Sequence, residues 1–160
     1  MRLGVVSDTH GHLRHAEQAA RLLETLDVDV LLHCGDIGSA EIPPILARWP
    51  THYVLGNVDY NSQELAAAIA DSGHTLHGLA GELELAGARI AFLHGHQQRR
   101  LEQTIAAGRN ALVCYGHTHL AEQHRAGGVW VLNPGALYRA NPHTFAIVDL
   151  PEITITRMAI

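Results

Sequence analysis

Apolar and polar positions follow two different patterns in the two parts of the chain. In the first part, short apolar runs lie at residues 3–6, 28–32 (interrupted by Asp29) and 53–55, and apolar or alanine positions recur every three or four residues at 13–26, 42–48 and 63–71. Short continuous runs indicate buried strands, and the wider spacing indicates helices. The first part is therefore predicted to form strand–helix–strand units.

After residue 74 the pattern changes to short, partly alternating segments separated by turns that contain glycine. One helix is expected at residues 100–107, and strands are expected at 75–79, 82–85, 89–93, 111–114, 121–125, 129–132, 144–148 and 153–157. The alternation favours antiparallel pairing for the first three of these strands. The fold class is α/β, and because no linker, repeat or low-complexity segment interrupts residues 1–160, we expect a single domain.

The composition narrows the classes of partner. Apolar residues make up 47% and charged residues 17% of the chain, a balance typical of soluble globular proteins. The net charge of −5 argues against nucleic acid, because neutralising phosphates requires clustered basic side chains. No apolar window approaches the roughly 18 residues of a membrane span, so we expect a cytoplasmic protein without membrane contact. Cys34 and Cys114 are expected to be buried and free, and the sequence leaves a homo-oligomer open.

Side chains that can bind metal follow most of the apolar runs. They are two aspartates, one asparagine and four histidines: Asp8, His10, Asp36, Asn57, His94, His117 and His119. In open α/β sheets, the carboxyl ends of the strands meet at the crevice where ligands bind, so these side chains are expected to converge. Each alone is a common turn, cap or surface residue, and only their joint occurrence at five strand ends indicates a site.

The donor set indicates the kind of metal. Carboxylate and amide oxygens with imidazole nitrogens suit Mn, Fe, Ni or Zn, whereas four imidazoles argue against a pure Mg or Ca site. Seven ligands exceed the needs of one such ion but fit two ions roughly 3.5–4 Å apart, if one carboxylate bridges them. We therefore expect two divalent cations, Mn before Fe, Ni or Zn. The total of 13 histidines agrees with metal chemistry.

Two pairs of these side chains share an i, i+2 spacing. Asp8 pairs with His10, and His117 pairs with His119. In extended backbone, such side chains point the same way about 6–7 Å apart. Each pair is therefore expected to lie in extended chain and to flank one ion or reach two.

In their order along the chain, these motifs resemble those of the calcineurin-like metallophosphoesterases. The matching motifs are Asp8-Thr9-His10, Gly35-Asp36, Gly56-Asn57, His94 and Gly116-His117-Thr118-His119. Within that superfamily, the small size and the stretches GNVD (56–59), LHGH (93–96) and LNPGAL (132–137) are similar to the compact YfcE-type phosphodiesterases. The resemblance implies a four-layer α/β/β/α sandwich with a dinuclear site at the edge of two packed sheets.

The resemblance also implies roles for the site residues. Asp8, His10 and His119 would hold one metal. Asn57, His94 and His117 would hold the other, with Asp36 as the bridge. The implied reaction is hydrolysis of a small phosphate diester by in-line attack of a metal-bridging hydroxide, with Asp36 and Asn57 as part of the catalytic centre.

The chain departs from the wider superfamily at one position. Val58 stands where many members have a histidine after Gly-Asn that is thought to protonate the leaving group. The compact phosphodiesterases also lack that histidine. His96, two residues beyond His94, is a third catalytic candidate because it could contact the phosphate or donate a proton, and the alternative is an exposed loop histidine.

Two other functions compete with the phosphodiesterase. The nearer one is a phosphomonoesterase or nucleotidase on the same site, which the valine disfavours for poor leaving groups. The other is a metal-free interaction scaffold, since a scaffold subunit of the retromer coat has the same fold with metal ligands partly replaced. All seven positions hold competent donors here, and a scaffold would have no reason to gather so many costly polar groups, so we expect an enzyme.

Overall fold

Two sheets form the framework of the protein. The computed structural model describes all 160 residues. The first sheet has the order β11 (Thr154–Ala159), β10 (Thr144–Asp149), β1 (Arg2–Val6), β2 (Val30–His33), β3 (Thr51–Tyr53), β4 (Thr75–Leu76). The second has the order β5 (Ala80–Leu85), β6 (Ala88–Leu93), β7 (Leu112–Cys114), β9 (Val129–Asn133), β8 (Glu122–Ala126).

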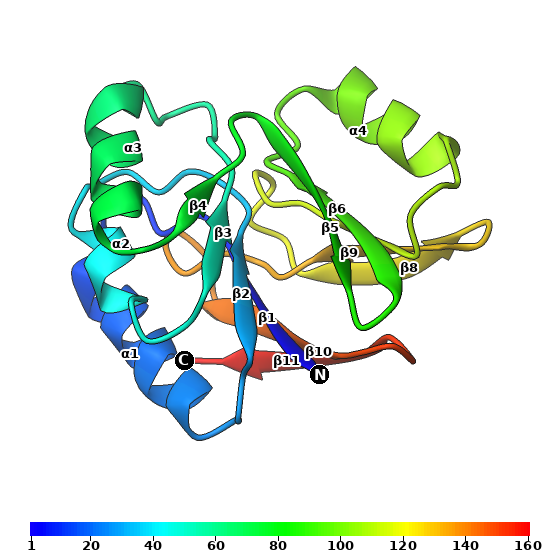
Figure 1. Cartoon of the computed structure of the whole chain (residues 1–160), viewed down its shortest axis with the longest axis horizontal. Coiled ribbons are helices and arrows are strands. Elements are labelled where there is room, and N and C mark those ends of the chain that lie inside the picture. The colour runs from blue at the N-terminus through cyan, green and yellow to red at the C-terminus, as the bar shows by residue number, and fades with distance from the viewer.

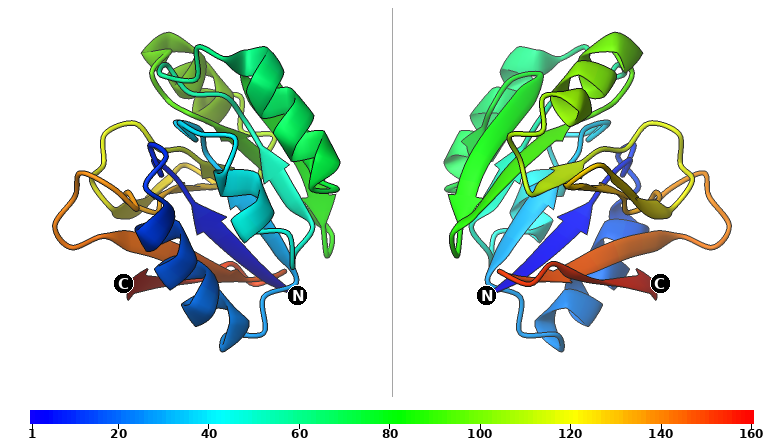
Figure 2. Two further views of the ribbon diagram at one scale, coloured as in Figure 1. Left: turned by 90° about the vertical axis from the view of Figure 1, so that its left-hand side faces the viewer. Right: turned by 90° about the vertical axis from the view of Figure 1, so that its right-hand side faces the viewer.

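Helices cover the outer face of each sheet. Helices α1 (Leu13–Glu24), α2 (Ile42–Ile45) and α3 (Ser62–Asp71) lie against the first sheet, and α4 (Gln98–Ala106) lies against the second (Figures 1 and 2). Three apolar clusters fill the interfaces between these layers. The predicted four-layer α/β/β/α sandwich is therefore confirmed.

The apolar runs of the sequence serve two layers at once. In β2 all four residues are buried; Leu31 packs in the helix-side cluster, whereas its neighbour Leu32 packs between the sheets. Successive side chains of a strand point to opposite faces, so a strand covered on both sides must be apolar throughout. Helix α1 needs only one apolar stripe, and its buried residues, which include Ala16, Ala19 and Leu23, recur at helical spacing.

The strand pairing confirms one expectation and corrects another. Strands β5 and β6 pair antiparallel, as predicted. The strand expected at residues 75–79 does not join them, because the crossover through α3 returns the chain to the first sheet, where β4 pairs parallel with β3. Helix α2 ends at Ile45, earlier than the expected 42–48. No helix has the length and apolar character needed to cross a membrane.

Both sheets direct strand ends to the same edge of the sandwich. Strands β1, β2 and β3 run parallel in one sheet, and β6, β7 and β9 run parallel in the other. The backbone N–H of Asp8 donates to Gly35 O (3.0 Å), and that of Gly116 donates to His94 O (3.0 Å). Loops from neighbouring strands are thereby fixed to each other. Cys34 and Cys114 are buried and free, as expected.

Candidate metal centre

The seven expected ligands all follow strands that end at this edge. Asp8 and His10 follow β1, Asp36 follows β2, and Asn57 follows β3. His94 directly follows β6, and His117 and His119 follow β7. Two groups of ligand atoms lie within 4.8 Å of one another: those of Asp8, His10 and His119, and those of Asp8, Asp36 and His94.

Asp8 is the centre of the first group. Its side chain is fully buried, and Oδ2 accepts hydrogen bonds from Ser7 Oγ (2.5 Å) and the backbone N–H of His117 (3.1 Å). Oδ1 has no hydrogen-bond donor, yet it lies 3.1 Å from His119 Nε2 and 3.7 Å from His10 Nε2. The two Nε2 atoms are themselves 3.2 Å apart. Such a convergence of acceptor atoms on a buried carboxylate oxygen suits a cation.

His94 and Asp36 are the centre of the second group. His94 Nε2 lies 3.0 Å from Asn57 Oδ1 and 3.3 Å from Asp36 Oδ2. The same Asp36 oxygen is 3.6 Å from His10 Nε2, so this carboxylate faces both groups. His117 is exposed, and its ring centroid lies 5.1 Å from that of His94, beside the second group.

Backbone carbonyls fix the tautomers of two imidazoles. His94 Nδ1 is 2.8 Å from Cys34 O, and His119 Nδ1 is 3.2 Å from Arg139 O. A carbonyl oxygen only accepts, so each Nδ1 carries a proton, and in the neutral imidazole the Nε2 lone pair faces the carboxylates. Metal-binding histidines are oriented in this way. The oxygen and nitrogen donors present therefore fit divalent cations.

Mutual contact shifts the pKa values of the central pair. Burial alone would raise the pKa of Asp36, but its hydrogen bond and charge interaction with His94 outweigh burial and lower it. Burial alone would lower the pKa of His94, but the hydrogen bond to Asp36 and the charges of Asp8 and Asp36 raise it. The site thus favours a negative carboxylate beside a positive partner.

The backbone at the ligands differs from what the spacing led us to expect. Both i, i+2 pairs were expected in extended chain, but φ is 55° at Asp8, 46° at His10, 68° at His117 and 60° at His119. Asp36 also has a positive φ, 53°. Left-handed backbone is uncommon for residues other than glycine and clusters at functional sites. This left-handed backbone turns each loop so that the side chains of a pair face the same site. The prediction of extended backbone at the two pairs was therefore wrong.

Two motif glycines are required by close approach. A Cβ atom at Gly56 would lie 2.0 Å from Asp36 Oδ1, and one at Gly116 would lie 2.5 Å from Asp8 Oδ2. Any side chain at these positions would displace a candidate ligand. The glycines before Asn57 and His117 are therefore part of the construction of the site.

Supporting residues brace the ligand loops. Asp59 accepts hydrogen bonds from the backbone N–H of Gly38 (2.9 Å) and Gly56 (2.7 Å), which ties the Asp36 loop to the Asn57 loop. Asn133 donates from Nδ2 to Gly116 O (2.9 Å) and Thr118 Oγ1 (3.0 Å). Three of these four bonds join residues at least 15 positions apart, so the sequence alone does not reveal the partners.

His96 lies beside the candidate ligands, and two further histidines stand at the N-terminal end of α1. The ring centroid of His96 is 5.5 Å from that of His94 and 6.3 Å from that of His117, and its Nδ1 is buried without a partner. It is not an exposed loop residue. His12, the N-cap residue of α1, and His15 are both half-buried, and His12 stacks on Tyr138 at a centroid distance of 4.7 Å.

Comparison with known proteins gives a consistent result. Residues 1–152 match the calcineurin-like phosphoesterase superfamily domain. Phosphodiesterase MJ0936 of Methanocaldococcus jannaschii is 29% identical over 154 residues, covering 93% of each chain. The solved structure of an archaeal phosphodiesterase has a TM-score of 0.93 and 26% identity, covering 100% of both chains.

The phosphoesterase YfcE of E. coli shares the fold, with a TM-score of 0.71 and 21% identity over 100% of both chains. The compact size that suggested this relationship is thus matched along the whole length of the chain. With residues 1–152 matched to the family and the architecture shared, the chain belongs to the calcineurin-like phosphoesterase superfamily and is a phosphoesterase, as its motifs predicted.

Proposed function

We propose that the chain is a phosphodiesterase that holds two divalent cations and hydrolyses a small phosphate diester by in-line attack of hydroxide. The observation that carries the proposal is the buried Asp8 Oδ1, which has no hydrogen-bond donor and faces the Nε2 atoms of His10 and His119. The family uses divalent metals, and we expect Mn²⁺ here, with Fe, Ni or Zn as alternatives.

The ligands divide into two sets in this proposal. Asp8, His10 and His119 hold one cation. Asn57, His94 and His117 hold the other. Asp36 would serve both sets, which is supported by the distances of its Oδ2 to His10 Nε2 (3.6 Å) and His94 Nε2 (3.3 Å). When bound, the cations supply positive charge that lowers the pKa of water and neutralises phosphoryl oxygens.

The chain's own residues keep the site ready for that charge. Carbonyl acceptors hold the Nδ1 protons of His94 and His119, so in the neutral imidazoles the Nε2 lone pairs are left for a cation. Ser7 and the backbone of His117 occupy Asp8 Oδ2, which leaves Oδ1 for a cation. The side chains therefore need little reorganisation when cations and substrate bind.

Val58 favours the diester, and His96 is a candidate for contact with the substrate. Val58 contributes only its backbone N–H, which donates to Asp36 Oδ1 (3.1 Å), and its side chain has no proton to transfer. His96 is the nearest remaining imidazole, with an unpartnered Nδ1, and we assign it contact with the phosphate or the leaving group. The name of the M. jannaschii relative, a phosphodiesterase, supports the same choice.

The complete set of seven candidate ligands argues against a metal-free interaction scaffold. All seven positions hold side chains able to bind metal, and the two carboxylates are buried. Burying charged groups is costly unless they are paired or bind a cation. A protein used only as a docking surface would gain nothing from that cost.

An assay of paired substrates tests the proposal. Protein stripped with a chelator and reloaded with Mn²⁺ is assayed on bis(p-nitrophenyl) phosphate and p-nitrophenyl phosphate, and bound Mn²⁺ is counted by equilibrium dialysis. We expect two ions per chain, a higher kcat/KM for the diester, and no turnover by the stripped protein. The D36N variant should lose at least about 100-fold in kcat/KM and bind less metal, because the bridge is gone.

A matched control uses an exposed aspartate. Asp71 lies at the end of α3, so D71N should keep both the metal content and the rate. If kcat/KM were higher for the monoester than for the diester, the phosphodiesterase assignment would be wrong and the phosphomonoesterase or nucleotidase assignment would take its place. Full activity in the stripped protein would overturn the metal centre itself.

A further inference from the structure

A pocket opens directly beside the candidate metal centre. Its volume is about 590 Å³, and its lining includes the candidate ligands His117 and His119 together with Leu120, Arg139 and Arg157. Arg139 is also joined to the centre through its backbone, because its carbonyl accepts the Nδ1–H of His119. A phosphodiester held at the metal centre would therefore place one of its two ester groups at this pocket.

The charge of the pocket is positive and unneutralised. Two of its lining residues are arginines, and none is an aspartate or glutamate. The arginine ion pairs of the chain join Arg2 to Asp149 and Arg48 to Glu24, so neither pocket arginine is paired. In a chain with a net charge of −5, two guanidinium groups without a carboxylate partner in one pocket form a local site for an anion, and that of Arg139 also lies over the Tyr138 ring (5.6 Å to the centroid).

The other side of the metal centre has the opposite character. A second pocket of about 400 Å³ lies beside the Asp36 and Asn57 loops, and its lining includes Gly38, Val58, Asp59 and Glu64. Its two carboxylates would repel an anionic group, so only the arginine side attracts one. An anionic arm of the substrate is therefore expected on the arginine side of the metal centre and not on the carboxylate side.

The rim of the arginine pocket also offers apolar surface. Leu120 is 71% exposed and lines the pocket beside Ala121 and Pro142. An exposed leucine in a pocket provides contact for the carbon skeleton that links two charged groups. The surface thus combines an apolar contact with a terminal anion site.

We infer that this pocket binds a second anionic group of the substrate, so that the substrate class is a phosphodiester with one ester arm that ends in a phosphate. This inference rests on the proposed function, because it assumes that a phosphodiester is hydrolysed at the adjacent centre. Arg139 and Arg157 hold the terminal phosphate, and Leu120 contacts the arm between the two phosphates.

Two matched substrates test the inference. Both are p-nitrophenyl diesters; the second ester group is a propyl chain in one, and a propyl chain that ends in a phosphate in the other. With the Mn²⁺-loaded protein, we expect kcat/KM to be about tenfold higher for the phosphate-bearing ester, the scale of a charge-assisted hydrogen bond. The ratio should fall towards one in the R157Q variant and also as the salt concentration rises.

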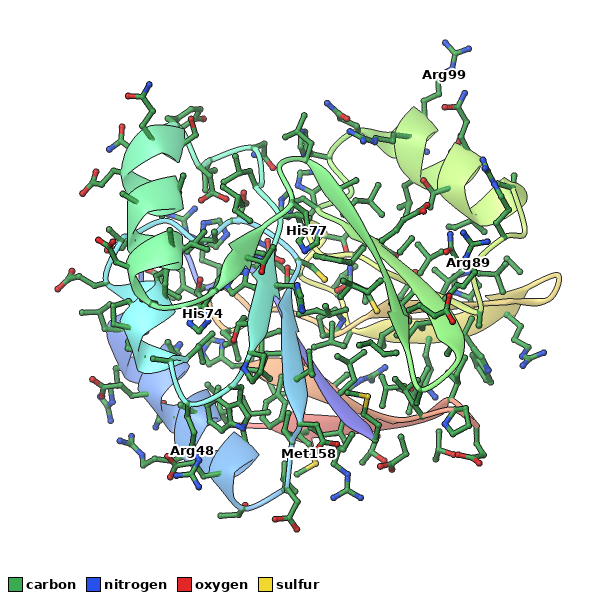
Figure 3. The ribbon with its side chains drawn as sticks, in the orientation of Figure 1. Arg48, His74, His77, Arg89, Arg99 and Met158 are labelled. Carbon is green, nitrogen blue, oxygen red and sulfur yellow. The ribbon has the colours of Figure 1, made fainter.

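The control is an arginine far from the pocket. Arg99 extends from α4 into solvent (Figure 3), and R99Q should keep the wild-type ratio. If the ratio of the two kcat/KM values is one in the wild-type protein, or if R157Q leaves it unchanged, the pocket does not bind a second anionic group, and the proposed phosphodiesterase function is unaffected. If neither diester is turned over, both the proposed function and the inference about the pocket are wrong.

Discussion

At the scale of single residues, the convergence of the candidate ligands could be predicted from the sequence, but their backbone conformation could not. The order of Asp8, Asp36, His94 and His119 along the chain was enough to predict that they converge. The positive φ at five of the seven expected ligands leaves no mark in the sequence, since none of these positions is a glycine. Left-handed backbone at such residues is imposed by surrounding contacts, which join distant segments.

The role of His96 can be tested by the choice of leaving group. If His96 donates a proton or hydrogen bond to the leaving oxygen, H96Q should lower kcat about 100-fold for a diester with an alkyl leaving group. The effect should be small for p-nitrophenolate, which leaves without protonation. Both rates are measured on Mn²⁺-loaded protein, and H124Q, at an exposed histidine of β8, serves as the control. Equal losses on the two esters would show that His96 only shapes the site.

At the scale of secondary-structure elements, the sequence predicted what is local. The strands β1, β2 and β6 were found because they are short apolar runs that end in polar motifs. The placement of β4 and β10 was not, since pairing partners depend on how the chain crosses over. Residues 75–79 alternate as an antiparallel strand would, yet only Thr75–Leu76 pairs, and it does so with β3. The alternation of apolar and polar residues indicates which face of a strand is buried, but it does not indicate the strand with which it pairs.

The end of β9 carries a testable brace for the ligand loop after β7. Asn133 is fully buried, donates to Gly116 O and Thr118 Oγ1, and accepts from the backbone N–H of Gly135 (3.0 Å). N133A leaves these buried groups without partners, so we expect roughly 2–4 kcal/mol lower stability in urea unfolding. Weaker Mn²⁺ binding should accompany it, because the loop that carries His117 and His119 is released.

A buried asparagine elsewhere provides the control for this brace. Asn110 is 7% exposed and lies just before β7, at the end of the strand away from the ligand loop. N110A should leave Mn²⁺ affinity at the wild-type value, whatever its effect on stability. If N133A bound Mn²⁺ as tightly as the wild-type protein, the brace would have no part in holding the site.

At the scale of the whole molecule, the sandwich encloses a histidine that is not one of the candidate metal ligands. His33 ends β2, is fully buried, and stacks on Tyr53 at a centroid distance of 5.3 Å. Thr9 Oγ1 donates to Ile37 O (3.0 Å), so His33 Nε2–H donates to Thr9 Oγ1 (3.0 Å) and Nδ1 is left buried without a partner. A proton added at Nδ1 would create a buried cation with no acceptor.

This histidine makes the stability of the fold depend on pH. Burial lowers the pKa of His33 from 6.5 to about 4, outweighing the charges of Asp59, Asp8 and Asp36, which act in the opposite direction. Between these two values the unfolded chain binds a proton that the folded protein does not, so the free energy of unfolding falls as the pH falls. From pH 7.5 to pH 5, this residue should remove roughly 2 kcal/mol.

Urea unfolding in the presence of chelator measures this dependence without a contribution from metal release. H33Q cannot take up the proton, so its loss of stability between pH 7.5 and pH 5 should be smaller than that of the wild-type protein by roughly 2 kcal/mol. The pKa values of His52, His74 and His77 are also lowered, primarily by burial, and these residues contribute equally to both proteins. Identical losses in the two proteins would mean that folding does not lower the pKa of His33, and the acid sensitivity would then belong to the other histidines.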